Sequence, residues 1–350
     1  MRQKQKNRKY GIILLSIFLI IGIIVSINLY KKILSSNVSL KDEKQEIYLC
    51  IPSNVGYNDV IELLKEKDYI IDIQSFRWVA EKKNYDRYVQ AGRYKIKDGM
   101  NNNELVNMLR SGDQEPVNLT INNIRTKADL ASKVSKQIET DSAKLVKLLN
   151  NNNFLKQYNF NTNTVYAMIL PDTYEFWWNT TAKGFISRMN KEHERFWNKE
   201  KSRKAENLNF SPVEVSTLAS IVDEETIRDD EMAKISGVYI NRLKKGMRLQ
   251  ADPTVKFAVG DFTIKRVLNK HLEIDSPYNT YKNSGLPPGP INFPSKKAIN
   301  SVLNYEEHDY LYFAAKPDFS GYHNFSETHY QHIRNARKYQ QALNEERIWR

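Results

Sequence analysis

An uninterrupted apolar segment near the N-terminus constrains this chain more than any other feature. Residues 11–30 read GIILLSIFLIIGIIVSINLY and carry no charged side chain over twenty positions. At 1.5 Å per residue, a helix of that length spans about 30 Å, the thickness of the hydrocarbon core of a bilayer. The segment therefore predicts a single transmembrane helix, with about 320 of the 350 residues following it.

The basic residues around this segment predict its orientation. Five precede it within the first ten positions, whereas only Lys31 and Lys32 follow it directly. The positive-inside rule then places the N-terminus in the cytoplasm and the rest of the chain outside the cell (inner) membrane. The alternative is a cleaved signal peptide, which has a shorter apolar core and a cleavage site of small residues. Because this core continues into Asn28, Leu29 and Tyr30, we favour a retained anchor.

Charge and composition narrow the classes of partner. The net charge is +12, and removing the five basic residues of the tail leaves +7 on the outer part. Such a surface suits an anionic wall polymer, although ordinary solvated lysines are the preferred explanation for most of these charges. No nucleic-acid-binding motif is present, so no nucleic acid partner is expected. A single cysteine, Cys50, excludes an internal disulfide, and the absence of a glycine-rich phosphate loop predicts no nucleotide cofactor.

The outer part divides by composition into a small module and a larger domain, and the fold class is α+β. After a polar, aperiodic tether, the apolar pattern predicts a strand at 46–52, a helix at 57–67 with Asn58 as its N-cap, a second helix at 70–79, a turn-rich stretch at 91–100 and a helix at 102–111. Asn-rich stretches around residues 150–163 are expected to be loops and mark the boundary before the larger domain. The expected segments are a cytoplasmic tail (1–10), a transmembrane helix (11–30), a linker (31–45), a small α+β module (46–115), a connecting segment (116–160) and a catalytic domain (161–350).

One helix in the larger domain carries acids in a distinctive arrangement. Ser211 followed by proline predicts its start, and Glu214 completes a capping box. At about 100° per residue, Glu225 falls about 20° from Leu218, inside the apolar stripe, whereas the two acids before it point elsewhere. A carboxyl group on a buried face has a raised pKa, as a general acid near neutrality requires. The alternatives are an acid that reaches solvent at the helix end, or a buried acid paired with Arg228 or Arg242.

Polar loops downstream supply groups that suit a sugar. Residues 237–255 read as a helix, a glycine stop and an extended polar stretch, and residues 276–290 as a long loop rich in Tyr, Asn and Thr. Residues 321–326 (GYHNFS) follow a predicted buried strand at 310–315. Asn, Thr and Tyr offer neutral hydrogen bonds and flat apolar faces to hydroxyl and acetamido groups. Turn formation alone is the competing explanation for each loop.

These motifs together resemble the endolytic murein transglycosylases of the YceG-like, or MltG, family. The matching stretches are LPDTY (170–174), LASIVDEET (218–226), NRLKKGMRLQADPTV (241–255), YNTYKNSGLPPGP (278–290) and HNFS (323–326). The family helix reads Glu-Lys-Glu-Thr with the second Glu catalytic, so the resemblance implies Glu225 as the catalytic acid. This chain departs at Asp223 and Glu224, which are not expected to carry the reaction. The resemblance also implies a LysM-like module at 46–115, either glycan-binding or only packing.

The resemblance implies a reaction and a set of substrate contacts. Such enzymes are carbon–oxygen lyases that cleave the β-1,4 bond between N-acetylmuramic acid and N-acetylglucosamine in nascent glycan without water, leaving a 1,6-anhydro end and ending strand elongation. The expected partners are peptidoglycan strands, the membrane and peptidoglycan synthases, and no cofactor is expected. The candidate substrate-binding residues, taken from the matching motifs, are Asn241, Arg242, Gln250, Asp252, Thr254, Tyr278, Asn279, Thr280, Tyr281, His323 and Asn324.

Three other functions compete with this interpretation. A hydrolase needs two carboxylates, and Asp252 and Asp172 are the other acids in the strong motifs, interpreted as hydrogen-bonding or orienting groups. A zinc site could use His329 and His332 one helical turn apart, but no third ligand stands out, and a solvated helix is preferred. A non-catalytic wall-binding scaffold is the remaining alternative, and the glutamate at position 225 favours the enzyme.

Overall fold

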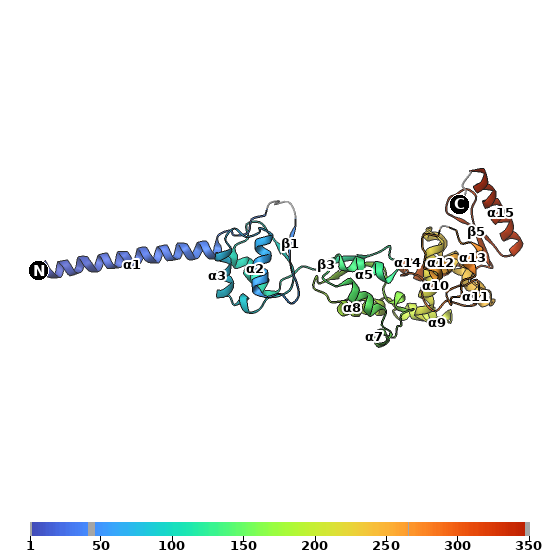
Figure 1. Cartoon of the computed structure of the whole chain (residues 1–350), viewed down its shortest axis with the longest axis horizontal. Coiled ribbons are helices and arrows are strands. Elements are labelled where there is room, and N and C mark those ends of the chain that lie inside the picture. The colour runs from blue at the N-terminus through green and yellow to red at the C-terminus, as the bar shows by residue number, and fades with distance from the viewer. Residues whose placement is uncertain (1, 41–45, 265, 347–350) are drawn as a thin grey trace. The chain divides into compact units, whose positions relative to one another are not determined.

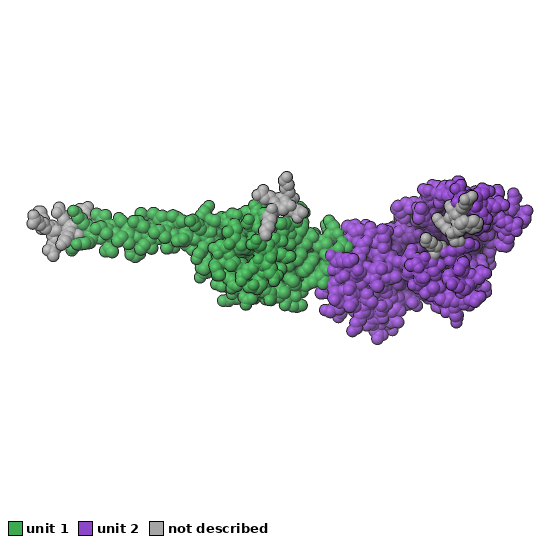
Figure 2. Space-filling model, turned by 45° about the horizontal axis from the view of Figure 1, so that its top comes forward, with its two compact units in different colours: residues 1–118, 137–139, 175–180 green, residues 119–136, 140–174, 181–350 purple. Residues whose placement is uncertain are grey.

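The computed structural model describes residues 2–40, 46–264 and 266–346 and shows a mixed α and β chain (Figure 1). The described residues form two compact units, coloured separately in Figure 2. The first comprises Met1–Asn118, Gln137–Glu139 and Glu175–Thr180, and the second comprises Leu119–Lys136, Thr140–Tyr174 and Thr181–Arg350.

The first unit begins with a long helix, α1 (Arg2–Leu34). Within it, Lys9–Leu34 is the one helical segment of the described residues that is long and apolar enough to cross a membrane, and its apolar side chains are exposed except Ile33, which is half-buried. This agrees with a membrane anchor. The other elements of the unit are β1 (Ile47–Ile51), α2 (Tyr57–Glu66), α3 (Ile73–Lys82), η1 (Tyr85–Arg87), β2 (Gly92–Ile96) and α4 (Asn102–Ser111).

Two local predictions in this unit were wrong. The stretch at 91–100 is not only turns, because β2 lies there and pairs antiparallel with β1, with Leu49 opposite Tyr94 in the buried core. The missed signal was the alternation of basic and apolar residues over positions 93–96 (RYKI), which matches the alternating burial along β2. The N-cap of α2 is Gly56 instead of Asn58, whereas α4 ends at Gly112 in the left-handed conformation.

The described part of the expected linker is packed, not a free tether. Helix α1 continues through Leu34, and Asn37 and Val38 are buried. The side-chain amide of Asn37 donates to Asn102 Oδ1 at 2.7 Å, and Asn102 in turn donates to the carbonyl of Lys32 at 2.8 Å. This buried amide network fixes the end of α1 to the unit, because unsatisfied buried amides are costly. Residues 41–45 lie outside the described residues.

The second unit contains most of the helices. Its elements, with β3 and β4 shared in part with the first unit, are β3 (Val117–Ile121), α5 (Lys127–Ser135), α6 (Ser142–Leu149), α7 (Asn152–Leu155), η2 (Lys156–Tyr158), η3 (Val165–Met168), β4 (Asp172–Phe176), α8 (Ala182–Phe196), α9 (Lys199–Asn207), α10 (Pro212–Glu225), η4 (Asp229–Glu231), α11 (Met232–Lys244), α12 (Asp252–Val259), α13 (Asn269–Leu272), α14 (Lys296–Leu303), β5 (Tyr312–Ala315), β6 (His323–Ser326) and α15 (His329–Glu345). Strands β3 and β4 pair, as do β5 and β6.

Helix α10 forms the centre of the main core of this unit. Residues 215–222 are all buried, and the helix packs against α11, α12 and α14. Beyond it the structure corrects two predictions. The stretch expected to be extended contains helix α12 from Asp252, and the strand expected at 310–315 is β5, whose side chains are half-buried. The β5–β6 hairpin supports α15, which has no fully buried residue among its described side chains.

Candidate active site

Capping contacts set the residue at which α10 begins, and the helical spacing from that residue sets where the side chains of its last turn point. Ser211 caps the helix by accepting a hydrogen bond from the backbone of Glu214, whose carboxylate accepts from the Ser211 backbone at 2.8 Å. Pro212 occupies the first turn, as the sequence predicts. The helix ends at Glu225, and Thr226 is already extended.

The three acids of the last turn lie in different environments. Asp223 accepts hydrogen bonds from the backbone and hydroxyl of Ser295 at 2.7 and 2.9 Å. Glu224 forms an ion pair with Arg125 at 2.7 Å. Glu225 instead accepts a hydrogen bond from the hydroxyl of Tyr239 at 2.7 Å. Asp223 and Glu224 line one pocket and Glu225 lines another, so the structure confirms that Glu225 points away from the two acids before it, as the helical spacing predicts.

The pKa of Glu225 is raised from its ordinary value to about 7. Desolvation by the surrounding protein is the main cause, and the nearby charge of Asp252 adds to it. The hydrogen bond from Tyr239 and the charges of Lys256 and Arg242 favour the ionised form and so oppose the shift. A carboxyl group with this pKa can both give and take a proton near neutrality.

Glu225 lines a pocket of about 360 Å³, which we call the Glu225 pocket. Its lining combines charged, amide, phenolic and imidazole groups with apolar side chains. The lining residues are Glu225, Tyr239, Arg242, Leu249, Gln250, Asp252, Tyr281, Tyr312, Phe313, His329 and His332. The pocket therefore offers flat rings and hydrogen-bonding groups around one carboxyl group.

Four predicted substrate-binding residues line this pocket. Arg242 lies over the ring of Tyr312 and donates to the carbonyl oxygens of residues 311 and 249 at 2.6 and 2.7 Å. Asp252, at the start of α12, accepts a 2.6 Å hydrogen bond from the hydroxyl of Tyr281. Gln250 has a positive φ of 49° and is exposed at the rim.

Four other predicted substrate-binding residues do not line the pocket but hold the loops that carry its lining residues. Thr254 and Thr280 are buried and their hydroxyls are 2.8 Å apart. Asn279 is fully buried and donates to the carbonyls of residues 272 and 274. Tyr278 packs against Phe257 with ring centroids 4.6 Å apart. These side chains hold the 276–283 loop in place and are not among the residues that line the pocket.

The last three predicted residues fix the β5–β6 hairpin. Asn241 donates from α11 to the carbonyl of His308 at 2.6 Å, just before β5. The ring of His323 is 2.8 Å from a carboxylate oxygen of Glu231, a contact that braces the start of β6. Asn324 lies opposite Ala314 in the hairpin. None of the three is among the residues that line the Glu225 pocket.

Several lining residues were missed from the sequence. Tyr239 lies fourteen residues beyond Glu225 on the next helix, and no spacing rule links them. His329 and His332 were assigned to a solvated helix, yet both line the pocket, and the ring of His332 stacks on Tyr312 at 5.3 Å. Their spacing of one turn places both histidines on one face of α15. The sequence does not show that this face lies against β5 and the Glu225 pocket.

The alternatives for Glu225 can be tested against these contacts. Arg228 donates to the carbonyl of Ser320, and Arg242 donates to backbone carbonyls, so the contacts that the structure gives these guanidinium groups do not include Glu225. Among the described residues, no group of three or more histidine, cysteine, aspartate or glutamate side chains is placed to hold a metal ion.

The comparisons with known proteins fit this geometry. A model of the YceG-like family matches residues 49–338. The chain belongs to the YceG-like family. A Bacillus subtilis protein named endolytic murein transglycosylase is 32% identical over 335 residues, covering 91% of each chain. A Streptococcus pneumoniae protein of the same name is 28% identical over 82% of this chain and 57% of its own.

A solved structure is also similar. The crystal structure of a yceG-like protein from Listeria monocytogenes matches with a TM-score of 0.56 at 29% sequence identity. The match covers 83% of this chain and 99% of that one. The family resemblance seen in the sequence motifs is thus confirmed across most of the chain.

Proposed function

We propose that this protein is a membrane-anchored endolytic lytic transglycosylase that cleaves nascent peptidoglycan strands at the bond between N-acetylmuramic acid and N-acetylglucosamine. The observation that carries the proposal is Glu225, a carboxyl group with a pKa of about 7 at the end of a buried helix, facing a polar and aromatic pocket. The curated relatives in the same family are named endolytic murein transglycosylases, which supports a lyase of this kind.

In the proposed reaction, one carboxyl group performs both proton transfers. Protonated Glu225 gives its proton to the glycosidic oxygen as the bond from C1 to that oxygen breaks, and N-acetylglucosamine leaves as the alcohol. The resulting carboxylate then takes the proton of the muramyl C6 hydroxyl while that oxygen bonds to C1. The 1,6-anhydro ring closes, Glu225 is protonated again, and no water is consumed.

Tyr239 positions this carboxyl group. Its phenol is buried and its pKa is raised well above the ordinary value by that burial and by the charge of Glu225, so it remains a donor. A donor on Oε1 stabilises the carboxylate and leaves Oε2 to carry the transferable proton. This arrangement favours the return of Glu225 as a base.

The remaining pocket residues are proposed to hold the glycan. Tyr281, Tyr312 and Phe313 supply flat faces for sugar rings, and Arg242, Gln250 and Asp252 supply hydrogen bonds. Asn241, Thr254, Tyr278, Asn279, Thr280, His323 and Asn324 then contribute by bracing the loops that carry this surface.

The location of the protein follows from α1. We propose that the N-terminus is cytoplasmic, that residues beyond the membrane are extracytoplasmic, and that residues 46–115 form a LysM-like module next to the membrane. Cuts within strands close to the bilayer make a peptidoglycan synthase the expected partner. We further propose residues 116–160 as the connecting segment and 161–350 as the catalytic domain.

The proposal is tested with Glu225→Gln in the full-length protein. We expect anhydro-muramyl ends from isolated peptidoglycan to form about 10² to 10⁴ times more slowly, because both transfers use this group. Glu206→Gln, an exposed acid on α9, serves as the matched control and should retain activity. Circular dichroism checks folding.

The possible outcomes distinguish an enzyme from a non-catalytic scaffold and also test whether the cuts lie within strands. An active, folded Glu225→Gln protein would refute the assigned mechanism. A wild-type protein that binds strands without forming anhydro ends would instead support the non-catalytic wall-binding scaffold. Products consisting only of terminal disaccharides would remove the endolytic part of the proposal and leave its chemistry intact.

A further inference from the structure

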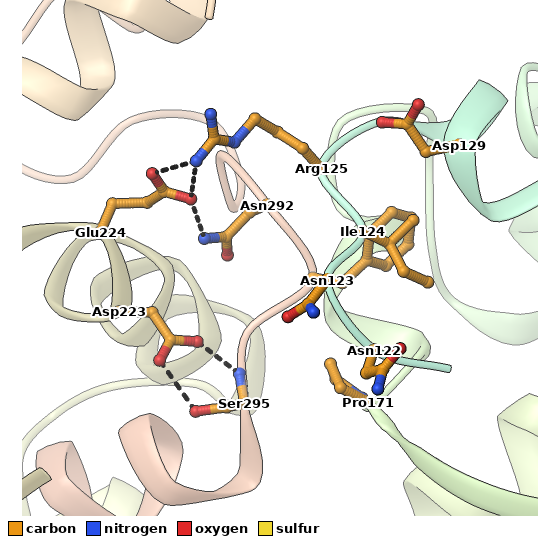
Figure 3. A pocket seen from close by; sticks show the side chains of 11 residues that line it. Asn122, Asn123, Ile124, Arg125, Asp129, Pro171, Asp223, Glu224, Asn292 and Ser295 are labelled. Atoms are coloured by element: carbon orange, nitrogen blue, oxygen red, sulfur yellow. Dashed lines mark hydrogen bonds and ion pairs between the residues drawn. The ribbon is translucent and has the colours of Figure 1, made fainter. Parts of the chain in front are cut away.

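A second, larger pocket of about 700 Å³ lies on the other side of the last turn of α10 (Figure 3). We call it the Asn292 pocket. It is built from the loop after β3, the start of α5, the end of α10 and the loop before α14. Its lining residues are Asn122, Asn123, Ile124, Arg125, Asp129, Pro171, Asp223, Glu224, Asn292, Phe293 and Ser295.

The charges that line this pocket are unbalanced. The lining contains three carboxylates, Asp129, Asp223 and Glu224, and one guanidinium, Arg125, which give a formal charge of −2. Arg125 is engaged by both oxygens of Glu224 at 2.9 and 2.7 Å. Asp129 accepts from the Thr126 cap of α5. Of the two carboxylates for which the described residues give no ion pair, Asp129 is exposed and the other is half-buried.

That carboxylate is Asp223, and its contacts are neutral. It accepts hydrogen bonds from the backbone and hydroxyl of Ser295. Burial raises the pKa of Asp223, which these two hydrogen bonds oppose. A half-buried carboxylate without a counter-charge favours a cationic ligand, because the ligand offsets its desolvation.

An unpartnered acceptor points into the same pocket. Asn292 is only 6% exposed and donates its amide to Glu224 at 3.0 Å, which fixes the orientation of its side chain. Its Oδ1 has no hydrogen-bond partner among the described residues and points away from Glu224, into the pocket (Figure 3). Buried amide oxygens are nearly always satisfied, so this one indicates a donor that arrives with a ligand.

The lining also limits the kind of cation. No group of three or more histidine, cysteine, aspartate or glutamate side chains among the described residues could hold a metal ion. Ile124, Pro171 and Phe293 give the pocket an apolar part. Acceptors beside an apolar wall match a primary ammonium on a short methylene chain.

We propose that the Asn292 pocket binds the side-chain ammonium of a diamino acid in the peptide stem of the glycan. This rests on the proposed function, since peptidoglycan strands carry such stems on their muramyl residues. Asp223 and the oxygen of Asn292 accept hydrogen bonds from the ammonium, and the apolar wall contacts its methylene groups. The pocket thereby selects strands whose stems retain a free amine.

The first test compares two substrates on the full-length protein in detergent. One is uncross-linked glycan with free stem amines, and the other is the same material after N-acetylation of those amines. We expect acetylation to raise KM about tenfold or more with little change in kcat. A tenfold change in affinity corresponds to the loss of about one hydrogen bond to a charged group. Equal KM values for the two substrates would overturn the proposal.

Variants assign this preference to the pocket. Asp223→Asn should abolish the preference for the free amine. The double variant Arg125→Gln, Glu224→Gln removes the ion pair while keeping the formal charge at −2, and it should retain the preference. If Asp223→Asn does not fold, Asn292→Ala removes the unpartnered oxygen and should weaken the preference. Retention of the full preference by a folded Asp223→Asn would contradict the assignment.

A binding measurement separates this proposal from the catalytic one. Calorimetry with the Glu225→Gln protein and a soluble stem tripeptide ending in lysine should give one-to-one binding, lost on adding Asp223→Asn. Binding of this tripeptide without strand cleavage by the wild type would refute the proposed reaction and support the pocket. Absence of tripeptide binding, with normal cleavage, would refute the pocket alone.

Discussion

The hydroxyl of Tyr239 donates a 2.7 Å hydrogen bond to Oε1 of Glu225, from the middle of α11 to the last residue of α10. Tyr239 is itself fixed by burial and by the edge of the Phe313 ring, with centroids 5.9 Å apart. The contact therefore holds the carboxyl group in one orientation and lowers its proton affinity relative to a purely apolar site.

This relationship predicts the effect of Tyr239→Phe on the pH profile. Protonated Glu225 starts the proposed reaction, so kcat/KM of the wild type should fall about tenfold per pH unit above about 7. The phenol lowers the pKa of Glu225, so its removal raises that pKa and should move the alkaline limb to higher pH. The measurement is kcat/KM between pH 5 and 9. An unmoved limb would assign Tyr239 a purely packing role.

Asp252→Asn should move the same limb in the opposite direction. The negative charge of Asp252 raises the pKa of Glu225, so a neutral amide lowers that pKa and the loss of kcat/KM should begin at lower pH. Asn still accepts the hydrogen bond from Tyr281, so the loop remains braced. The two variants form an internal control, because a general loss of packing would not shift the limb in opposite directions. A shift to higher pH would contradict the electrostatic account.

Local signals predicted the helix that carries the site. The Ser211-Pro212 start and the capping box fixed the register of α10, and its periodicity placed Glu225 apart from Asp223 and Glu224. Such contacts lie within one turn of the helix, so the sequence contains them. Element type was predicted correctly for much of the rest, including β1, α2 and α4.

Long-range contacts could not be predicted in this way. The pocket lining beside Glu225 comes from α11, α12, the 276–283 loop, β5 and α15, and their assembly depends on packing. His329 and His332 illustrate this, because a helix spacing shows that they share a face and not what the face covers. Residues 37–40 were assigned to a tether for the same reason, since their burial depends on α3 and α4.

The membrane orientation can be tested by labelling single cysteines. In a Cys50→Ser background, a membrane-impermeant maleimide should label Glu206→Cys in intact spheroplasts, and Asn7→Cys only after lysis. The expectation follows from the basic residues before the apolar segment 11–30. The opposite labelling pattern would reverse the topology. Release of a soluble form shortened by about 30 residues would indicate a cleaved signal sequence instead of an anchor.

Gly237 allows the segment before β5 to lie directly against α11. A Cβ at this position would collide with the backbone carbonyl of Glu306 and lie 2.7 Å from Nε2 of His308. From the same face of α11, Asn241 donates to the carbonyl of His308 at 2.6 Å. This close contact sets the position of β5, whose Tyr312 lines the Glu225 pocket.

Gly237→Ala should therefore destabilise the protein, although alanine favours a helix by about 1 kcal/mol over glycine. Overpacking against backbone costs about 1–3 kcal/mol, and displacement of β5 should also reduce kcat/KM. Lys244→Ala, an exposed change on the same helix, is the matched control and should alter stability by less than about 0.5 kcal/mol. Thermal unfolding and kcat/KM for both variants provide the measurement. A Gly237→Ala protein as stable as the control, with full activity, would show that the segment before β5 moves aside without disturbing the pocket.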